Sequence, residues 1–490
     1  MAIKKPRNSR ENSRKSAKFN DFEKDLVARP IREIPGLIEF DLPVHGDNRG
    51  WFKENYQFAK LRELGLPADF HPVQNNISFN EKRGVTRGLH AEPWNKFISV
   101  ANGEVFGAWV DLRPGKTFGH TYSTILTPAK AIYVPEGLAN GFQTLTDDTV
   151  YTYLVDAHWS PDAKYTMVNA ADPALKIKWP ISLKQAERSE KDLNHPLLRD
   201  VEPIQPKKVM ITGAYGQLGS ELAKLFPDAT KIDRDTLDLT DQAALAKINW
   251  REYDLILNAA GYTNVDGAET EQGRRDTWAA NATAVRNLAL IAKEYNLTLV
   301  HISSEYVFDG TREVHTEDEP FAPLGVYAQA KAAAEELMPL LDKYYVLRIT
   351  WAVGNGKNFV RTMYELANKN IQPKVVNDQI GRLTFMDEVA RAAKHLLDTK
   401  AAYGTYNLTG DGYSVSFCEI AKEVFALAGH SRDEVTGIST EEYFANATTP
   451  ISPRPHFSTL NLAKIKATGF VPRDWSEQMK EYVAKLQEEK

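Results

Sequence analysis

The pattern of the sequence changes at Lys207, and this change constrains the fold more than any other feature. Before it, from about Val27 to Pro180, short runs of Val, Ile, Phe and Tyr are separated by turn-forming residues such as Gly46-Asp47-Asn48. This spacing is typical of an all-β sandwich or barrel. After Lys207, buried-strand runs alternate with helical stretches, which predicts a doubly wound parallel sheet. The 490 residues are therefore expected to form a multidomain chain with two unlike halves.

The composition is that of a globular protein, with 42% hydrophobic and 26% charged residues, which excludes disorder or a simple coiled coil for the bulk of the chain. No apolar run reaches the roughly 18 residues of a membrane helix, and the N-terminus lacks the apolar segment of a signal peptide. The single cysteine, Cys418, excludes an intrachain disulfide and a CxxC metal site, which favours the reducing cytoplasm. A net charge of -5 gives no reason to expect nucleic-acid binding.

Composition also predicts the domain limits. Residues 1–24 are expected to be a disordered basic tail, because residues 1–18 have almost no apolar side chains. A nucleic-acid or targeting role for the tail is the less favoured alternative, since charge runs are usually solvated. Residues 25–200 are expected to form the β domain, and 207–490 the α/β domain. The proline-punctuated residues 201–206 are expected to link them.

The strongest motif is a glycine turn directly between a predicted strand and a predicted helix. Gly213, Gly216 and Gly219 stand three apart. The first permits a tight turn, the second lets the backbone approach a pyrophosphate, and the third lets the helix pack on the sheet. Asp233 follows at the end of the next predicted strand, where an acidic residue favours NAD. The adjacent Arg234 could instead hold a 2′-phosphate and favour NADP, so the sequence leaves this choice open.

A second group of residues predicts hydride-transfer chemistry. Tyr327 and Lys331 are four apart on a predicted helix and so share a face. The lysine charge is expected to lower the pKa of the phenol, so that Tyr327 can give a proton to a carbonyl. This spacing is common by chance, but Ser304 ends a predicted strand at the edge where α/β sites form. Ser304 would hold the carbonyl oxygen, and Lys331 would orient the nicotinamide ribose.

Residues 207–490 resemble the dTDP-4-dehydrorhamnose reductase family of extended short-chain dehydrogenases. The resemblance rests on the glycine turn and on the motifs LDLTD from Leu237, NAAGYTNVDGAE from Asn258, HISSEYVFDG from His301, NDQIG from Asn377 and RPHFS from Arg454. It implies a Rossmann-type sheet with a small substrate-binding subdomain. It also implies reduction of a C4 ketone by NADPH, with NADH left open.

The same resemblance implies site residues. Trp351 and Arg454 should contact the nucleotide sugar. The cofactor should contact Gly213, Gly216, Gln217, Leu218, Gly219, Asp233, Arg234, Asp238, Leu239, Ala259, Ala260, Tyr327 and Lys331. Two positions depart from the family pattern: Ser304-Glu305 replaces the usual Thr-Asp, and Ala328 replaces the usual Gly. Glu221 falls where some members bind Mg²⁺ at a dimer interface, but other members lack this metal, and none is predicted.

In the β half, one polar cluster stands out, in the run RGVTRGLH from Arg83 to His90 and in Lys96 beyond it. Taken alone, His90 is more often a core histidine than a catalytic one. Alternation along a strand puts Arg87 and His90 on opposite faces, so both can face the interior only if the strand bulges.

Residues 28–200 resemble the dTDP-4-dehydrorhamnose 3,5-epimerase family, which has a cupin-like jelly roll. The resemblance rests on RGVTRGLH, on DNRGWFKE from Asp47 and on Gln74-Asn75-Asn76. It implies that His90 is the base, oriented by Asp172, and that Tyr153 is the acid on the opposite face of the sugar. Lys96 would stabilise the enolate oxygen. The implied substrate-binding residues are Arg49, Glu54, Gln74, Asn76 and Arg87, the two arginines suiting the pyrophosphate.

Together the resemblances predict a bifunctional enzyme, because the epimerase product is the reductase substrate. The expected product is dTDP-L-rhamnose. The expected partners are a nucleotide-sugar substrate and a second copy of the chain, joined through the epimerase-like domain, with no nucleic acid and no membrane. One alternative is the same chemistry on another 4-keto-6-deoxy sugar nucleotide. Another is a β domain that binds without turnover or serves only in oligomerisation, since Asn75, Asn140 and Leu154 replace the usual Asp, His and Lys.

Overall fold

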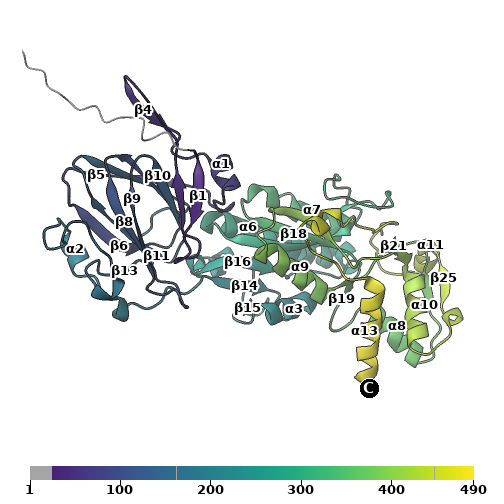
Figure 1. Ribbon diagram of the computed structural model, residues 1–490. Coiled ribbons are helices and arrows are strands. Elements are labelled where there is room, and N and C mark those ends of the chain that lie inside the picture. The colour runs from purple at the N-terminus through teal and green to yellow at the C-terminus, as the bar shows by residue number, and fades with distance from the viewer. Residues whose placement is uncertain (1–24, 162, 446, 490) are drawn as a thin grey trace, which may run out of the picture. The chain divides into compact units, whose positions relative to one another are not determined.

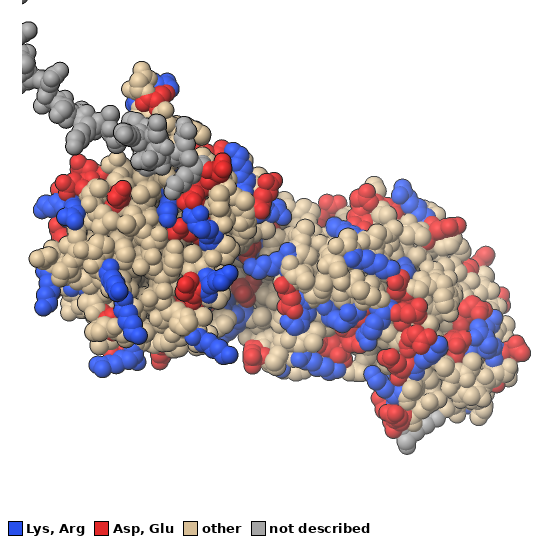
Figure 2. Space-filling model, viewed as in Figure 1, with Lys and Arg blue, Asp and Glu red and all other residues tan. Residues whose placement is uncertain are grey.

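The computed structural model describes residues 25–161, 163–445 and 447–489, and the expected basic tail lies outside them. The chain divides along the sequence into two compact units, with the boundary between Pro206 and Lys207 (Figure 1). Among the described residues, no helix has both the length and the apolar character needed to cross a membrane. On the face drawn in Figure 2, acidic and basic side chains are interspersed over both units.

The first unit is a sandwich of two antiparallel sheets, as the predicted jelly roll requires. One sheet has the order β1 (Val27–Pro30), β2 (Ile38–Asp41), β10 (Lys130–Val134), β7 (Lys96–Asn102), β12 (Thr149–Val155) and β5 (Gln74–Asn80). The other has the order β13 (Thr166–Met167), β6 (Thr86–Ala91), β11 (Leu138–Thr144), β8 (Val105–Asp111) and β9 (Thr121–Leu126). Ile98 and Tyr151 from the first sheet pack with Trp109 and Phe142 from the second in one buried cluster.

Three smaller elements of this unit matter for the site. The hairpin of β3 (Val44–Asp47) and β4 (Gly50–Lys53) projects from the sandwich (Figure 1). Helix α1 (Phe58–Glu63) follows it, and the short helix α2 (Glu190–Leu193) lies near the end of the unit. Residues after α2 still pack on the sandwich, because Val201 is buried and the Ile204 N–H donates to the Leu112 carbonyl over 2.7 Å.

Strand β6 pairs irregularly with β11, at the place where the sequence called for a bulge between Arg87 and His90. His90 lies opposite Asn140 on β11, whereas Arg87 lies opposite Phe142. Moving three residues along β6, from Arg87 to His90, therefore corresponds to moving two residues along β11. The extra residue on β6 makes this a β-bulge. Gly88 sits inside the bulge with a φ of +108°, and a Cβ there would lie 2.7 Å from the Asn140 carbonyl oxygen. The bulge offsets the alternation that would otherwise hold Arg87 and His90 on opposite faces.

The second unit is built on a six-stranded parallel sheet, confirming the predicted Rossmann-type fold. Its order is β15 (Thr230–Ile232), β14 (Lys208–Thr212), β16 (Tyr253–Asn258), β17 (Thr298–Ser304), β18 (Tyr344–Ile349) and β23 (Gly404–Leu408). The chain runs outward from β14 to β15 and then returns to β16 on the other side. Such a reversal opens a crevice at the carboxyl ends of the strands, where ligands bind.

Helices cover both faces of this sheet, because successive strand residues point to opposite sides. Ile211 packs with α3 (Gln217–Leu225) and α9 (Met386–Asp398), whereas its neighbour Met210 packs with α6 (Ala284–Tyr295) and the end of α7 (Val326–Glu335). A third apolar cluster joins α8 (Phe359–Asn368), α10 (Phe417–Leu427) and α13 (Trp475–Glu488). This cluster forms the expected small subdomain.

Candidate active sites

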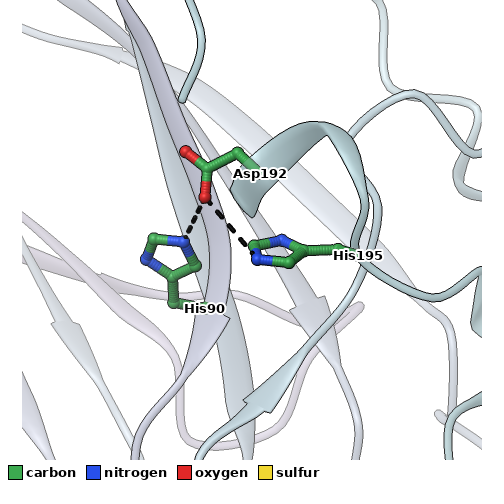
Figure 3. A group of neighbouring side chains, drawn as sticks. All are labelled: His90, Asp192 and His195. Carbon is green, nitrogen blue, oxygen red and sulfur yellow. Dashed lines mark hydrogen bonds and ion pairs between the residues drawn. The ribbon is translucent and has the colours of Figure 1, made fainter. Parts of the chain in front are cut away.

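His90 and Asp192 form the centre of the site in the first unit. The His90 Nε2–H donates to Asp192 Oδ1 over 2.7 Å, and Asp192 is 5% exposed (Figure 3). Strand β6 carries the histidine. Helix α2 carries the aspartate and starts where the Ser189 side chain accepts from the Asp192 N–H. Burial opposes ionisation of Asp192, but the bonds from His90 and the Gly88 N–H keep the pKa of its carboxyl below the usual value.

His195 is a third member of this group that the sequence did not reveal. Its Nε2 lies 3.7 Å from the same Asp192 oxygen, and its ring meets the His90 ring edge-on at 5.4 Å between centroids (Figure 3). Burial and the neighbouring His90 lower the pKa of His195. Within the described part of the chain, His90, Asp192 and His195 also form the one group of three whose ligand atoms could hold a metal ion, all within 4.8 Å.

The expected pairing of His90 with Asp172 is wrong. Asp172 caps the short 3-10 turn Pro173–Leu175, where its Oδ1 accepts from the Ala174 N–H over 2.8 Å. Its Oδ2 accepts from the Leu198 N–H over 2.7 Å. Both oxygens of Asp172 therefore accept hydrogen bonds from backbone N–H groups, and the carboxylate that His90 contacts belongs to Asp192 instead.

Lys96 is buried beside His90's strand partner. It is 3% exposed, and its ammonium contacts the Glu92 carboxylate and the side-chain oxygen of Asn140. Asn140 is the residue that faces His90 across the sheet. Burial lowers the pKa of Lys96 to about 7, while the adjacent carboxylate favours the charged form. Asn140 therefore connects the two residues, because it contacts Lys96 and is paired with His90 across the sheet.

Tyr153 lies on β12 within reach of this group. The Lys96 ammonium is 5.9 Å from the centre of its ring. Burial raises the pKa of the Tyr153 phenol, and the positive charge of Arg87 opposes the shift. Asn76 is the β5 residue paired with Tyr153, and its side-chain oxygen accepts from Gln74 over 2.9 Å. These predicted residues therefore line adjoining strands of one sheet.

Two of the predicted substrate-binding residues, Arg49 and Glu54, pair with residues other than His90, Lys96 and Tyr153 in this chain. Arg49 sits at the exposed turn of the β3–β4 hairpin and pairs with Asp47 over 2.5 Å. Glu54 follows the hairpin and pairs with Lys60 of α1 over 2.8 Å. Neither side chain has a contact with His90 or Lys96.

In the second unit, a cavity of about 390 Å³ opens at the sheet reversal. Eight of the predicted cofactor residues line it: Gly213, Gly216, Asp233, Arg234, Asp238, Leu239, Ala259 and Ala260. A Cβ on Gly213 would lie 2.8 Å from the Ala260 N, and a Cβ on Gly219 would lie 2.1 Å from the Gly213 carbonyl oxygen. Side chains at Gly213 and Gly219 would therefore clash with backbone, while Gly213 and Gly216 line the cavity without side chains, as a pyrophosphate site requires.

The other predicted cofactor residues contribute differently. The Gln217 side chain donates to the Lys357 carbonyl over 3.1 Å, and Leu218 packs in the core. Both lie in the first turn of α3, so their backbone N–H groups are the ones available to an anion. Lys331 Nζ lies 3.5 Å from where a Cβ on Gly261 would stand, and Gly261 lines the cavity. Glu221 farther along α3 is partnered by Lys224 at 2.7 Å.

The predicted catalytic residues of this unit meet at the end of β17. Ser304 Oγ donates to Glu305 Oε2 over 2.7 Å. The Tyr327 phenol also forms a side-chain hydrogen bond with Ser304. Lys331 donates from Nζ to the Ile302 carbonyl over 2.9 Å. Burial lowers the pKa of the Lys331 ammonium to about 8.

The expected effect of Lys331 on Tyr327 is not seen in this arrangement. Burial and the Glu305 carboxylate instead raise the pKa of the Tyr327 phenol well above its usual value. The reason is geometric, because the ammonium is engaged with a backbone carbonyl while the carboxylate lies beside Ser304.

Arg454 also belongs to this cluster. Its guanidinium lies 6.0 Å from the centre of the Tyr306 ring, which in turn meets the Tyr327 ring edge-on at 6.0 Å. Arg454 pairs with Asp266 at 2.8 Å, a contact that the sequence did not reveal. Trp351 stacks on Phe417 of the small subdomain at 3.8 Å between centroids.

Known protein families match the two units separately. The family described as RmlD substrate binding domain matches residues 207–488, and the family described as dTDP-4-dehydrorhamnose 3,5-epimerase matches residues 32–200. An RmlC homolog of Streptococcus pyogenes is 55% identical over 192 residues, which cover 38% of this chain and 96% of that protein. A dTDP-4-dehydrorhamnose reductase of Aggregatibacter actinomycetemcomitans is 35% identical over 293 residues, covering 56% of this chain and 97% of that protein.

A solved structure resembles the second unit. It is the dTDP-4-dehydrorhamnose reductase of Bacillus anthracis in complex with NADP, which is 32% identical. The match covers 56% of this chain and 98% of that chain, with a TM-score of 0.51. The chain therefore belongs to the dTDP-4-dehydrorhamnose 3,5-epimerase family through residues 32–200 and to the RmlD family through residues 207–488.

Proposed function

We propose that this chain makes dTDP-L-rhamnose from dTDP-4-dehydro-6-deoxy-D-glucose in two steps. The first unit inverts C3 and C5 of the sugar, and the second reduces the C4 ketone with NADPH. One observation carries the proposal: a single chain holds both a His90–Asp192 pair beside a buried lysine and a Ser304–Tyr327–Lys331 group beside a nucleotide-sized cavity. The product of the first chemistry is the substrate of the second.

In the first unit, the C4 ketone acidifies the hydrogens on C3 and C5, because each carbanion delocalises onto the same oxygen. Neutral His90 removes these protons from one face, and the Asp192 carboxylate stabilises the imidazolium that forms. The Lys96 ammonium stabilises the enolate oxygen. At each carbon in turn, Tyr153 delivers a proton from the opposite face, and His90 and Tyr153 exchange protons with solvent before the second inversion. Support comes from the contact of Lys96 with Asn140, which faces His90 across the sheet.

In the second unit, the side-chain-free glycine turn fits a pyrophosphate, and Arg234 beside Asp233 fits the additional phosphate of NADPH. The bound state of the Bacillus anthracis relative supports the same cofactor. When bound, NADPH supplies the hydride that reaches C4. Ser304 positions the ketone oxygen, and Tyr327 donates a proton to it. Lys331 lies at the cavity edge, where it can orient the ribose.

We further infer a homodimer formed through the first unit. Strand β5 is an edge strand, and it exposes Ile77 by 68% and Phe79 by 56%. The projecting hairpin exposes Phe52 by 70%. Such apolar edges are normally covered. A second copy that covers β5 with its hairpin would also bring Arg49 to a sugar-nucleotide site. Phe79→Asp should then yield monomers in sedimentation velocity, whereas Tyr413→Asp, at an exposed residue of the second unit, should not.

We also propose the domain limits 25–200 and 207–490, joined by residues 201–206, and a cytoplasmic location for the reaction. Val201 and Ile204 pack on the first unit, so the connection that does not pack is shorter than residues 201–206. Buried Cys418, the one cysteine of the chain, gives no sign of an oxidising compartment. Limited proteolysis should cut near Pro206 and release two stable fragments.

A second candidate is a first unit that binds the nucleotide sugar without turnover, because Asn140 replaces the family's usual histidine. Exchange of the C3 and C5 hydrogens separates the two candidates. With the 4-keto substrate in D₂O and no NADPH, an active epimerase incorporates deuterium at both carbons. Binding without exchange would favour the second candidate and refute the epimerase half of the proposal.

A further inference from the structure

The Ser304 hydroxyl of the second unit is hydrogen-bonded to the side chain of its neighbour, Glu305. Ser304 Oγ donates its proton to Glu305 Oε2 over 2.7 Å, and Glu305 is 3% exposed. A serine hydroxyl has one proton to give. While that proton is bonded to Glu305, Ser304 has none to offer to a ketone oxygen. The hydroxyl that the proposed reaction requires as a donor is therefore engaged elsewhere when Glu305 is ionised.

Glu305 is enclosed by polar and charged groups from three parts of the chain. Ser304 precedes it on β17, Tyr306 follows it, and Tyr327 reaches it from α7. Ser458 and Arg454 face it from the C-terminal RPHFS motif. Burial raises the pKa of Glu305 to about 7, although Ser304, Ser458 and Arg454 oppose the shift. Both protonation states of this carboxyl are therefore accessible near neutral pH.

We propose that Glu305 is a positioning residue of the reductase, and that its neutral form turns the Ser304 hydroxyl toward the substrate ketone. A neutral carboxyl donates its own proton to Ser304 Oγ, which frees the serine proton for the ketone oxygen. An ionised carboxylate accepts the serine proton and holds it away. The two arrangements differ by the one proton that Glu305 exchanges with solvent and by the direction of the Ser304–Glu305 hydrogen bond. No proton passes between Ser304 and the substrate. The proposal rests on the reductase function proposed above.

A second effect acts in the same direction. The charge of Glu305 also raises the pKa of Tyr327, which makes the phenol a weaker acid. Ionisation of Glu305 therefore removes the Ser304 donor and weakens the Tyr327 proton donor together. Reduction should slow as pH rises through the titration of Glu305. Loss of one such donor typically lowers kcat by about 10²–10³-fold.

The test is the pH dependence of kcat for reduction of pre-epimerised substrate by the full chain, from about pH 5 to about pH 9. The wild-type rate should fall with a midpoint set by Glu305. Glu305→Gln, whose amide can donate to Ser304 at every pH, should abolish that fall. Ser458→Ala should move the midpoint to higher pH, because Ser458 favours the ionised form of Glu305. NADPH binding should be unchanged in both variants, since neither residue lines the cofactor cavity.

Each outcome decides the matter. An alkaline fall of kcat that persists unchanged in Glu305→Gln would overturn the proposal, as would a wild-type rate that does not depend on pH. If Glu305→Gln fails to fold, Glu305→Asp keeps a titrating carboxyl. It should keep the fall at a shifted midpoint, and an unshifted midpoint would overturn the proposal. Absence of reduction by wild type at every pH would instead refute the reductase function itself.

Discussion

His90 Nε2 donates a 2.7 Å hydrogen bond to Oδ1 of Asp192, a residue 102 positions farther along the chain. The bond joins a strand of the sandwich to a four-residue helix near the end of the unit. It fixes the direction of the imidazole and supplies a buried counter-charge for the imidazolium form.

Asp192→Asn should therefore lower the rate of C3 and C5 exchange by about 10²–10⁴-fold. The amide can accept a hydrogen bond but cannot balance the charge of a protonated His90. Asp172→Asn is the matched control, because its carboxylate holds the Ala174 and Leu198 N–H groups instead. An amide has one acceptor oxygen in place of two, so this variant loses one of these two hydrogen bonds. It should lose about 1 kcal/mol of stability and keep its exchange rate. Equal losses of exchange in the two variants would contradict the assignment. Deuterium NMR and thermal unfolding measure the two effects.

Glu92→Gln should change the pH dependence of epimerisation. Lys96 stabilises an enolate only while it is charged, so exchange should decline as pH rises through the pKa of Lys96, which burial lowers to about 7. The Glu92 carboxylate contacts the ammonium and favours its charged form. Its removal should move the decline to lower pH. An exchange profile that is identical in wild type and Glu92→Gln would show that this contact does not set the charge of Lys96.

Tyr327→Phe should lower the rate of reduction by about 10²–10⁴-fold while leaving NADPH affinity nearly intact. The variant removes the proton donor, whereas the glycine turn that receives the pyrophosphate is untouched. Stopped-flow oxidation of NADPH and fluorescence titration of the cofactor separate the two quantities. Substantial retention of turnover would assign the proton to another group.

Two glycines of the turn should respond differently to the same substitution. A Cβ on Gly219 would lie 2.1 Å from the Gly213 carbonyl oxygen, so Gly219→Ala should destabilise the unit by about 1–3 kcal/mol. A Cβ on Gly216 would lie 3.3 Å from that oxygen, and Gly216 lines the cavity. Gly216→Ala should fold nearly as well as wild type and bind NADPH more weakly. Equal thermal stability of the two variants would contradict this division of roles.

The sequence predicted those parts of the molecule that depend on local pattern. The glycine turn, Asp233 and Ala260 line one cavity because strand–helix alternation places them at one edge of the sheet. Ser304 and Tyr327 meet for the same reason. The all-β sandwich or barrel followed from short strands separated by turns, whereas the jelly roll followed from the resemblance to the epimerase family.

Contacts between distant segments could not be predicted in the same way. Asp192 and His195 lie in a stretch whose polar composition resembles a tail, and only the docking of α2 beside β6 gives them a role. The resemblance implies Asp172 as the partner of His90, yet the Asp172 carboxylate caps backbone. Arg49 stands apart from the site because its hairpin projects from the sandwich.

The central claim is that one chain carries two separate active sites that act in sequence. The most direct measurement is NMR analysis of the products formed from dTDP-4-dehydro-6-deoxy-D-glucose and NADPH by wild type and by His90→Ala. Wild type should form dTDP-L-rhamnose. His90→Ala should form none from this substrate but should reduce the pre-epimerised 4-keto sugar at the wild-type rate. Formation of dTDP-L-rhamnose by His90→Ala from the first substrate, or loss of both activities in the folded variant, would contradict the account.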